Sequence, residues 1–412
     1  MHICIVSQNH LCRNPRVLKE AILWSQNGYQ VSIGTFWYNN ELLELDKKLI
    51  EESDLHGKII YQSYTDIREK TLENVYIRTE FQLARVIKKW IGLESLQLSG
   101  YGSTRVIPWI LNQNPDIVSC HQEIACLITP KLKKKKIPFF VDFEDWYSKD
   151  LLPEDQKLRP VRMLEKAEAF AVTNAIFTLT PSKAMSEAIH SSYGGNKPYT
   201  IYNSFSEKLR NISNDNLRAS INDKKLTLAW VSQWIGHGRG LDKMIVYLQQ
   251  LELEVEIHLA GNISSNYDRY LQKLASEKGN IKLIFHPILH PSYIVSWLSQ
   301  FDAGIASEPI TSYSTDLTVS NKLFYYLLAG IPVIAFDTLG QSEIAKSAPN
   351  AIIICDKNVK SLQIITSWKK ENEVYKKAKE ESYTTGTKFS WEKQSYDYLN
   401  LMKSYYQTTK QT

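Results

Sequence analysis

The stretch SNKLFYYLLAGIPVIA, residues 320–335, joins a predicted helix to a predicted buried strand. Ser320 or Asn321 can cap a helix whose apolar residues recur at helical spacing, and Gly330 suits the left-handed turn that ends it. The non-polar run at 332–336 then predicts a fully buried strand. Because ligands of open parallel sheets lie beside strand ends and helix N-termini, we expect an anion at the start of this helix.

Lys322 stands in the first turn of the predicted helix, where its charge would add to the attraction for a phosphate. The alternative is a solvated lysine on an ordinary helix, since helix–strand pairs of this composition are common in α/β domains. The local sequence by itself leaves both interpretations open.

Similar units of strand and helix precede this stretch and predict an α/β fold with doubly wound parallel sheets. A helix is expected over 15–27, with Gly28 as its stop, and another is expected from Ser182. The expected strands lie at 3–7, 31–34, 116–119, 139–142, 175–179, 226–231, 255–260, 281–285, 303–306 and 333–336.

A chain of 412 residues with 43% hydrophobic content is long enough for two core-forming domains. Residues 211–225 are rich in Asn, Asp, Ser and Lys, which is typical of a linker. We therefore expect one domain over 1–210, a linker at 211–225 and a second domain over 226–388. Apolar residues after 389 lie at helical spacing and predict a final amphipathic helix over 389–412.

Charge and cysteine content exclude several classes of protein. The net charge of +5 comes from 49 basic and 44 acidic residues, a balance that argues against a nucleic-acid partner. The five cysteines form no Cys-x-x-Cys pair, so neither a zinc site nor a disulfide framework is indicated, and a reducing cytosol is the simplest compartment. The chain starts directly as a strand and has no apolar run near the roughly 20 residues of a membrane span. We expect a cytoplasmic protein.

Two segments leave peripheral contact with the cytoplasmic membrane face open. The basic run at 131–136 could touch anionic headgroups, although a solvated helix end would look the same. Residues 84–111 mix basic and aromatic side chains, including Trp90 and Trp109, with aliphatic ones. That mixture suits interfacial membrane contact as well as an ordinary amphipathic helix.

The opening stretch resembles the Pro-x-Lys-x-x-Glu-Tyr-x-x-x-Gly-x-Pro-Val signature of retaining nucleotide-sugar glycosyltransferases with the GT-B fold, chiefly glycosyltransferase family 4. The matching positions are Lys322, Tyr326, Gly330, Pro332 and Val333. Segments 14–21, 180–183 and 202–204 also resemble family elements. The resemblance implies two Rossmann-like domains that face a cleft, with the final helix returning to the first domain.

On the donor side, the resemblance implies that Arg239 and Lys322 stabilise the departing diphosphate as catalytic cations. Residues 231–241, which read VSQWIGHGRGL, resemble the family's strand-loop-helix element that ends in this cation. The implied donor-binding residues are Gln233, Gly238, Glu308, Asp316, Thr318, Ser320, Asn321 and Tyr325.

The donor side also departs from the family pattern. Ser232 and Gln233 stand where many relatives have Gly-Arg. The family's two spaced glutamates are replaced by Leu317 and Tyr325, and a phenol is a weaker acceptor for ribose hydroxyls than a carboxylate. Glu308 and Asp316 are near enough in sequence to substitute.

On the acceptor side, residues 116–121 look like the family strand that ends in an active-site histidine, which implies that His121 faces the cleft. Asn9, Arg16 and Asp145 are the implied acceptor-binding residues. Two structural alternatives stand beside these roles: a satisfied histidine after a buried strand, and a surface arginine at a helix start.

The segment Asp142-Phe143-Glu144-Asp145 superficially resembles the Asp-x-Asp metal motif of the GT-A fold. The two-domain pattern fits GT-B better, so we expect no metal and no cofactor besides the nucleotide sugar, with a UDP-sugar favoured over a GDP-sugar. The implied reaction transfers the sugar, with retention, to a hydroxyl of a glycan or lipid-linked acceptor in bacterial surface polysaccharide synthesis. A catalytically degenerate GT-B scaffold is the alternative, and a sugar-nucleotide epimerase is a third.

Overall fold

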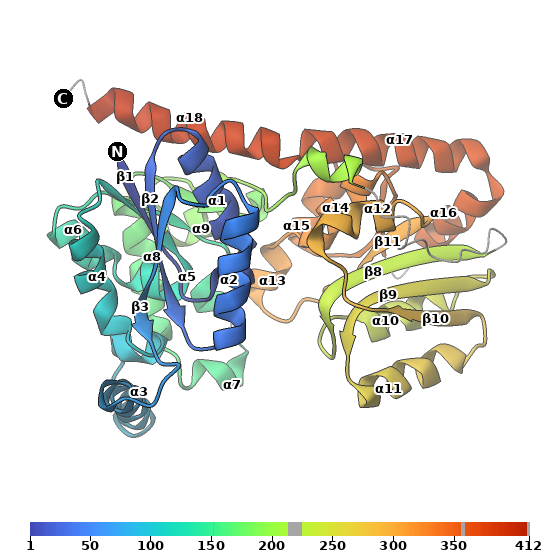
Figure 1. Cartoon of the computed structure of the whole chain (residues 1–412). Coiled ribbons are helices and arrows are strands. Elements are labelled where there is room, and N and C mark those ends of the chain that lie inside the picture. The colour runs from blue at the N-terminus through green and yellow to red at the C-terminus, as the bar shows by residue number, and fades with distance from the viewer. Residues whose placement is uncertain (151, 213–224, 356–358, 410–412) are drawn as a thin grey trace. The chain divides into compact units, whose positions relative to one another are not determined.

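The computed structural model describes residues 1–150, 152–212, 225–355 and 359–409, which fall into two compact units (Figure 1). Unit 1 comprises Met1–Pro181, Met185–Ile201 and Lys403–Thr412. Unit 2 comprises Ser182–Ala184 and Tyr202–Met402. Most of the predicted linker at 211–225 lies outside the described residues. No helix within the described ranges is both long and apolar enough to cross a membrane.

Unit 1 is built on a parallel sheet with the strand order β3-β2-β1-β4-β5-β6-β7. Its strands are β1 (His2–Val6), β2 (Gln30–Trp37), β3 (Ile59–Asp66), β4 (Ile117–His121), β5 (Phe139–Asp142), β6 (Thr178–Thr180) and β7 (Tyr199–Thr200). The central strands β1 and β4 are buried along their whole length, as expected for a parallel sheet that is covered on both faces. The strand order reverses direction between β1 and β4, which is where ligands of such sheets bind.

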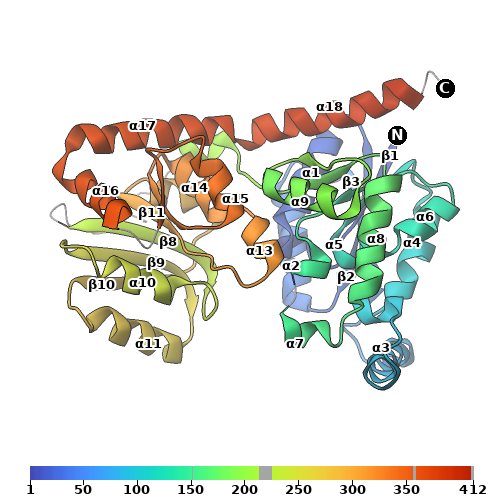
Figure 2. The same ribbon diagram turned by 180° about the vertical axis from the view of Figure 1, so that it is seen from behind.

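Helices lie on both sides of this sheet, and α3 lies at the lower end of the unit in Figures 1 and 2. They are α1 (Pro15–Gln26), α2 (Asn40–Glu52), α3 (Leu72–Ile91), α4 (Val106–Gln113), α5 (Gln122–Leu127), α6 (Thr129–Lys134), α7 (Pro153–Gln156), α8 (Val161–Asn174) and α9 (Lys183–Tyr193). The helix predicted over 15–27 is confirmed as α1, and Asn14 caps it by accepting hydrogen bonds from the backbone N–H groups of Arg16 and Val17.

Unit 2 repeats the architecture with the strand order β10-β9-β8-β11-β12-β13, so its order reverses between β8 and β11. The strands are β8 (Leu226–Ile235), β9 (Val255–Ile263), β10 (Ile281–His286), β11 (Ala303–Ala306), β12 (Val333–Phe336) and β13 (Ile352–Cys355). The helices are α10 (Leu241–Leu248), α11 (Ser265–Ser276), α12 (Ile294–Leu298), α13 (Tyr313–Leu317), α14 (Asn321–Ala329), α15 (Leu339–Ala345), α16 (Val359–Lys370), α17 (Asn372–Lys388) and the first part of α18 (Trp391–Thr409), which belongs to unit 1 from Lys403 on.

The stretch at 320–335 folds as predicted. The Ser320 hydroxyl accepts a hydrogen bond from the backbone N–H of Lys322 at 3.3 Å and caps α14, and Gly330 ends that helix at φ 71°. Tyr326 is fully buried and donates a hydrogen bond to the carbonyl oxygen of Ile305 in β11 at 2.8 Å. A Cβ at Gly304 would lie 2.1 Å from the Tyr326 ring, so α14 packs on β11 only because that position is glycine.

Candidate functional site

Two loops meet at the point where the strand order of unit 2 reverses. Residues 236–240 follow β8, and residues 307–308 follow β11. The Ser307 hydroxyl donates a hydrogen bond to the carbonyl oxygen of Arg239 at 3.0 Å. A Cβ at Gly240, which has φ +70°, would lie 1.9 Å from the carbonyl oxygen of Ser307, so glycine is required for this approach. We call these two loops and the first turn of α14 the switch edge.

Arg239 is exposed on the switch edge, although its backbone is fixed by the hydrogen bond from Ser307. Its guanidinium makes no hydrogen bond or ion pair with any residue in the described ranges. A guanidinium can hold a phosphate through two parallel hydrogen bonds. Arg239 is therefore an available cation at a position where parallel sheets bind ligands.

Lys322 lies on the same edge but is already engaged. Its side chain is 13% exposed and forms an ion pair with Glu308, which follows β11. Its Nζ atom also lies 4.9 Å from the centre of the Trp230 ring on β8, within the range of a cation–π contact. Burial alone would raise the pKa of Glu308, but the charge of Lys322 and hydrogen bonds from Lys322 and Ser320 outweigh it and lower that pKa.

The two predicted phosphate cations are thus connected through consecutive residues. Ser307 bonds to the backbone of Arg239, and Glu308 pairs with the ammonium group of Lys322. The resemblance implies that both cations serve one site, and the structure brings their segments to one edge of one sheet. A diphosphate bound there would have to exchange with Glu308 at Lys322.

The remaining predicted donor residues differ in their contacts and in their exposure. The Tyr325 ring stacks on Phe205, with 3.5 Å between ring centroids. One carboxylate oxygen of Asp316 accepts a hydrogen bond from the backbone N–H of Leu339 at 3.0 Å, and the Thr318 hydroxyl donates to the carbonyl oxygen of Ser314 at 2.8 Å. The exposed members are Gln233, Gly238 and Asn321.

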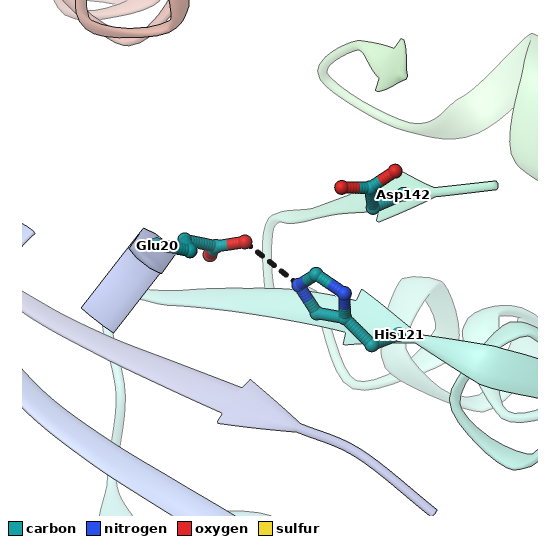
Figure 3. Close-up of side chains that lie close together, drawn as sticks. All are labelled: Glu20, His121 and Asp142. Atoms are coloured by element: carbon teal, nitrogen blue, oxygen red, sulfur yellow. Dashed lines mark hydrogen bonds and ion pairs between the residues drawn. The ribbon is translucent and has the colours of Figure 1, made fainter. Parts of the chain in front are cut away.

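In unit 1, His121 ends β4 and lies between the carboxylates of Glu20 and Glu144. Figure 3 shows its contact with Glu20. Its Nε2 lies 2.7 Å from a carboxylate oxygen of Glu20, and its Nδ1 lies 2.7 Å from a carboxylate oxygen of Glu144. The Asn14 amide donates to the same Glu144 oxygen, and the Trp24 indole donates to Glu20. We call Asn14, Glu20, His121 and Glu144 the His121 network.

The expectation that His121 faces a cleft is corrected by its burial, because its side chain has no exposed surface. Burial alone would lower the pKa of His121, but the charge of Glu20 and the hydrogen bonds that the ring donates to Glu144 and Glu20 raise that pKa to about 10. The ring is therefore a fixed imidazolium at neutral pH. It can shape the electrostatic field of the site, but it has no free nitrogen for a substrate.

Arg16 is also buried, so neither a surface arginine nor an exposed substrate contact describes it. Its Nε donates to a carboxylate oxygen of Asp142 at 2.5 Å, and its Nη1 donates to the carbonyl oxygen of Ile201 at 2.8 Å. The side chain ties α1 to the end of β5 and to the residue after β7. Its contacts are those of a structural arginine.

Three buried side chains, Glu20, His121 and Asp142, offer ligand atoms within 4.8 Å of one another (Figure 3). Both ring nitrogens of His121 are held by carboxylates, and its raised pKa keeps the ring protonated. The guanidinium of Arg16 also forms an ion pair with Asp142. A divalent ion would have to displace the proton of His121 and bind beside the guanidinium of Arg16. These side chains are therefore better suited to holding a protonated histidine than to binding a metal ion.

Asp145 and Lys19 are the partly buried groups of this region that titrate near neutral pH. Burial, followed by the negative charges of Asp150 and Glu144, raises the pKa of Asp145 to about 7. Burial and the charge of Arg16 lower the pKa of Lys19 to about 7. A carboxyl with such a pKa can exchange a proton with a hydroxyl group more readily than an ordinary aspartate can.

A pocket of about 820 Å³ opens at the carboxyl ends of β1, β2 and β3. Asn9, one of the predicted acceptor residues, lines this pocket beside four aromatic rings and three arginines. These rings and arginines are Phe36, Tyr38, Phe81, Tyr101, Arg78, Arg85 and Arg159. Flat rings and guanidinium groups suit a saccharide that carries a negative charge.

Gln122 is a residue that the sequence analysis missed. It follows His121 with φ 63°, a left-handed conformation that is uncommon for a residue other than glycine. Its side-chain oxygen accepts hydrogen bonds from the Ser7 hydroxyl at 3.1 Å and from the Gln8 backbone N–H at 2.7 Å. It therefore ties the end of β4 to the loop after β1, at the reversal point of unit 1. No sequence pattern marks such a residue.

Comparison with known proteins gives matches only at the level of structure. No protein-family model matches the chain, and no curated protein matches it in sequence. Sucrose-phosphate synthase from Thermosynechococcus elongatus matches with a TM-score of 0.70 at 11% identity, over 99% of this chain and 100% of that one. The HepE protein of Anabaena in complex with UDP and glucose matches with a TM-score of 0.63 at 13% identity, over 98% of this chain and 100% of that one.

A third solved structure is the lipopolysaccharide outer core galactosyltransferase WaaB in its apo form. It matches with a TM-score of 0.60 at 16% identity, over 98% of this chain and 99% of that one. Identities this low establish the shared fold and nothing finer. Together with the two parallel sheets, these matches confirm the predicted GT-B fold.

Proposed function

We propose that the protein is a glycosyltransferase that uses a nucleoside diphosphate sugar. The observation that carries this proposal is the switch edge, where an available guanidinium at Arg239 and the Lys322–Glu308 pair stand beside the capped start of α14. Loss of a diphosphate needs fixed positive charge more than a nucleophile. The match to a protein that was solved with UDP and glucose supports the same assignment.

In the proposed reaction, Arg239 and Lys322 bind the diphosphate, and Lys322 exchanges its Glu308 partner for a phosphate oxygen. The acceptor is a hydroxyl of a glycan or of a lipid-linked saccharide. The departing diphosphate takes up the hydroxyl proton on the same face, which leaves the anomeric configuration retained. Membership of glycosyltransferase family 4, independence from metal, a preference for UDP-sugars and a role in bacterial surface polysaccharide synthesis complete the proposal.

On the acceptor side, we assign the 820 Å³ pocket of unit 1 to the acceptor and Asn9 to its polar wall. Asp145, with a pKa of about 7, is assigned to hydrogen bonding with the acceptor hydroxyl, whose proton passes to the departing diphosphate. The buried imidazolium of His121 and the buried guanidinium of Arg16 are assigned a positioning role.

A panel of nucleotide sugars tests the proposal. Specific binding stabilises the folded state, so we expect one UDP-sugar to raise the melting temperature in a saturable way and to be hydrolysed slowly without an acceptor. Nuclear magnetic resonance of the product should show the retained anomer. An inverted product would contradict the retaining mechanism alone, and an isomerised nucleotide sugar would indicate an epimerase.

A non-catalytic GT-B scaffold is the second candidate, and Tyr325 favours it. This residue stands where the resembled family places a ribose-binding glutamate, and its ring stacks on Phe205. Asp316, one possible substitute, already accepts a hydrogen bond from the Leu339 backbone. If no nucleotide sugar in the panel stabilises the protein, the scaffold is the correct assignment.

A further inference from the structure

Helix α3 exposes a row of large apolar side chains to solvent. Three members have large exposed fractions, 91% for Leu72, 57% for Leu83 and 78% for Trp90. The complete α3 stripe consists of Leu72, Val75, Tyr76, Leu83, Val86 and Trp90. Monomeric proteins rarely leave so many large apolar side chains together in water, so the stripe indicates a binding surface.

The stripe faces away from unit 1. Its members recur at intervals of three, four and seven residues, which places them along one side of the helix. The opposite side carries the buried residues Asn74, Ile77 and Ala84. The exposed apolar side chains therefore do not contribute to the core of unit 1.

Charge is distributed unequally along the two edges of the stripe. One edge carries Arg78, Arg85 and Lys89, of which Arg78 and Lys89 are exposed. The other edge carries Glu73 and Glu80, and both carboxylates already have partners. Glu73 pairs with Arg105, and Glu80 accepts a hydrogen bond from the Gln97 amide at 3.1 Å. The net charge beside the stripe is positive.

We propose that α3 lies in the interface of an anionic lipid bilayer, with its apolar stripe inserted among the acyl chains. A long amphipathic helix with large apolar residues, a tryptophan near one end and basic residues along an edge has the features of an interfacial helix. Anionic headgroups would pair with Lys89. The basic run at 131–136 differs, because its exposed residues are lysines and its apolar Leu132 is buried.

The side of α3 that faces unit 1 lines the pocket assigned to the acceptor, an assignment that rests on the proposed function. Arg78, Phe81 and Arg85 of this helix line the 820 Å³ pocket. A bilayer bound to the stripe would therefore lie on the other side of the helix that forms this wall of the pocket. A saccharide linked to a membrane lipid through a phosphate could then place its anion against Arg78 and Arg85 and its sugar among the aromatic rings.

Co-sedimentation with lipid vesicles tests the docking surface without any need for activity. The vesicles are phosphatidylcholine alone, or phosphatidylcholine with about one-third phosphatidylglycerol. The test variant is the double substitution Leu83→Gln and Trp90→Gln. Its control, Leu45→Gln with Tyr270→Gln, removes two exposed apolar side chains from other helices. A second test variant, Lys89→Glu, reverses a charge beside the stripe, and Lys134→Glu is its control.

We expect the wild type and both controls to bind the anionic vesicles, to bind phosphatidylcholine far less, and to dissociate as salt rises. The stripe variant should bind at least about tenfold more weakly, because two inserted side chains are lost, and Lys89→Glu should also weaken binding. Wild-type protein that stays in the supernatant, or a stripe variant that binds like its control, would overturn the proposal. So would a dimer in solution that disappears with the stripe substitutions.

Two further measurements keep the result interpretable. Circular dichroism should show that the stripe variant is folded, because its substituted side chains are exposed. Its thermal stabilisation by a UDP-sugar should equal that of the wild type, because the switch edge is in unit 2. A protein that binds vesicles but no nucleotide sugar would overturn the proposed function and leave the membrane surface standing.

Discussion

At the scale of single residues, the Lys322–Glu308 pair sets the charge that a donor would meet. Substituting Glu308→Gln removes the carboxylate that neutralises Lys322, so the free ammonium group should bind UDP more tightly, by about three- to tenfold. Isothermal titration calorimetry measures this change. Weaker binding by the variant would instead assign Glu308 to the ribose hydroxyls, the role that sequence proximity suggested.

The buried imidazolium of His121 makes a prediction about stability and pH. Its pKa in the folded protein, about 10, lies above the ordinary value of 6.5, so folding takes up a proton. The stabilisation is complete below pH 6.5 and is lost as pH rises toward 10. His121→Gln leaves the buried carboxylate of Glu20 and the partly buried carboxylate of Glu144 without their cation, and should cost about 3–5 kcal/mol of unfolding free energy at pH 6.

Urea unfolding of the His121→Gln variant and the wild type at pH 6 and pH 9 checks this prediction. The difference between the two proteins should shrink at the higher pH. His56→Gln, which replaces an exposed histidine on the surface, is the matched control. A difference that is the same at both pH values would show that the ring is neutral in the folded protein.

The His121 network also shows where residue-level prediction fails. The sequence placed His121 correctly at the end of a strand, but it could not show that Glu20, a hundred positions earlier, closes over the ring. Arg16 was misplaced for the same reason, because its partner Asp142 is equally remote along the chain. Burial of a polar side chain depends on contacts that have no local signature.

At the scale of elements, the turn from β4 into α5 depends on Gln122. Gln122→Ala keeps the left-handed backbone and loses the hydrogen bonds to Ser7 and Gln8, so it should destabilise the protein by about 1–3 kcal/mol. Gln122→Gly loses the same bonds but relieves the backbone strain, so it should be less destabilising than the alanine variant. Urea midpoints of the two variants decide the order, and a more stable alanine variant would contradict it.

Secondary structure was predictable where the pattern is local. The strands β5, β11 and β12 have the predicted bounds, and each is a short, mostly non-polar run. The strands β8 and β9 extend beyond the predicted ends, because their ladder resumes after an irregularity at 232–233 with the pairs Trp234–Asn262 and Ile235–Ile263. The strand β3 was missed because its sequence, IIYQSYTD, mixes polar and apolar residues at the edge of the sheet, and β7 is only two residues long.

At the scale of the whole molecule, the GT-B architecture followed from repeated strand–helix units and from the motif at 320–335. The length of the chain indicated two domains, and the structure has two compact units with one parallel sheet each. The sequence also predicted that the segments of Arg239 and Lys322 lie at one edge of the sheet of unit 2. The sequence could not reveal that Glu308 forms an ion pair with Lys322, because that pairing depends on the turn after β11.

The central claim is that Arg239 and the first turn of α14 form one diphosphate site. The most direct test is calorimetry of UDP binding to the wild type, to Arg239→Ala and to Arg269→Ala, a control that removes an exposed arginine from α11. We predict that the control binds UDP like the wild type and that Arg239→Ala binds at least about tenfold more weakly. Equal UDP affinity in all three proteins would contradict the claim.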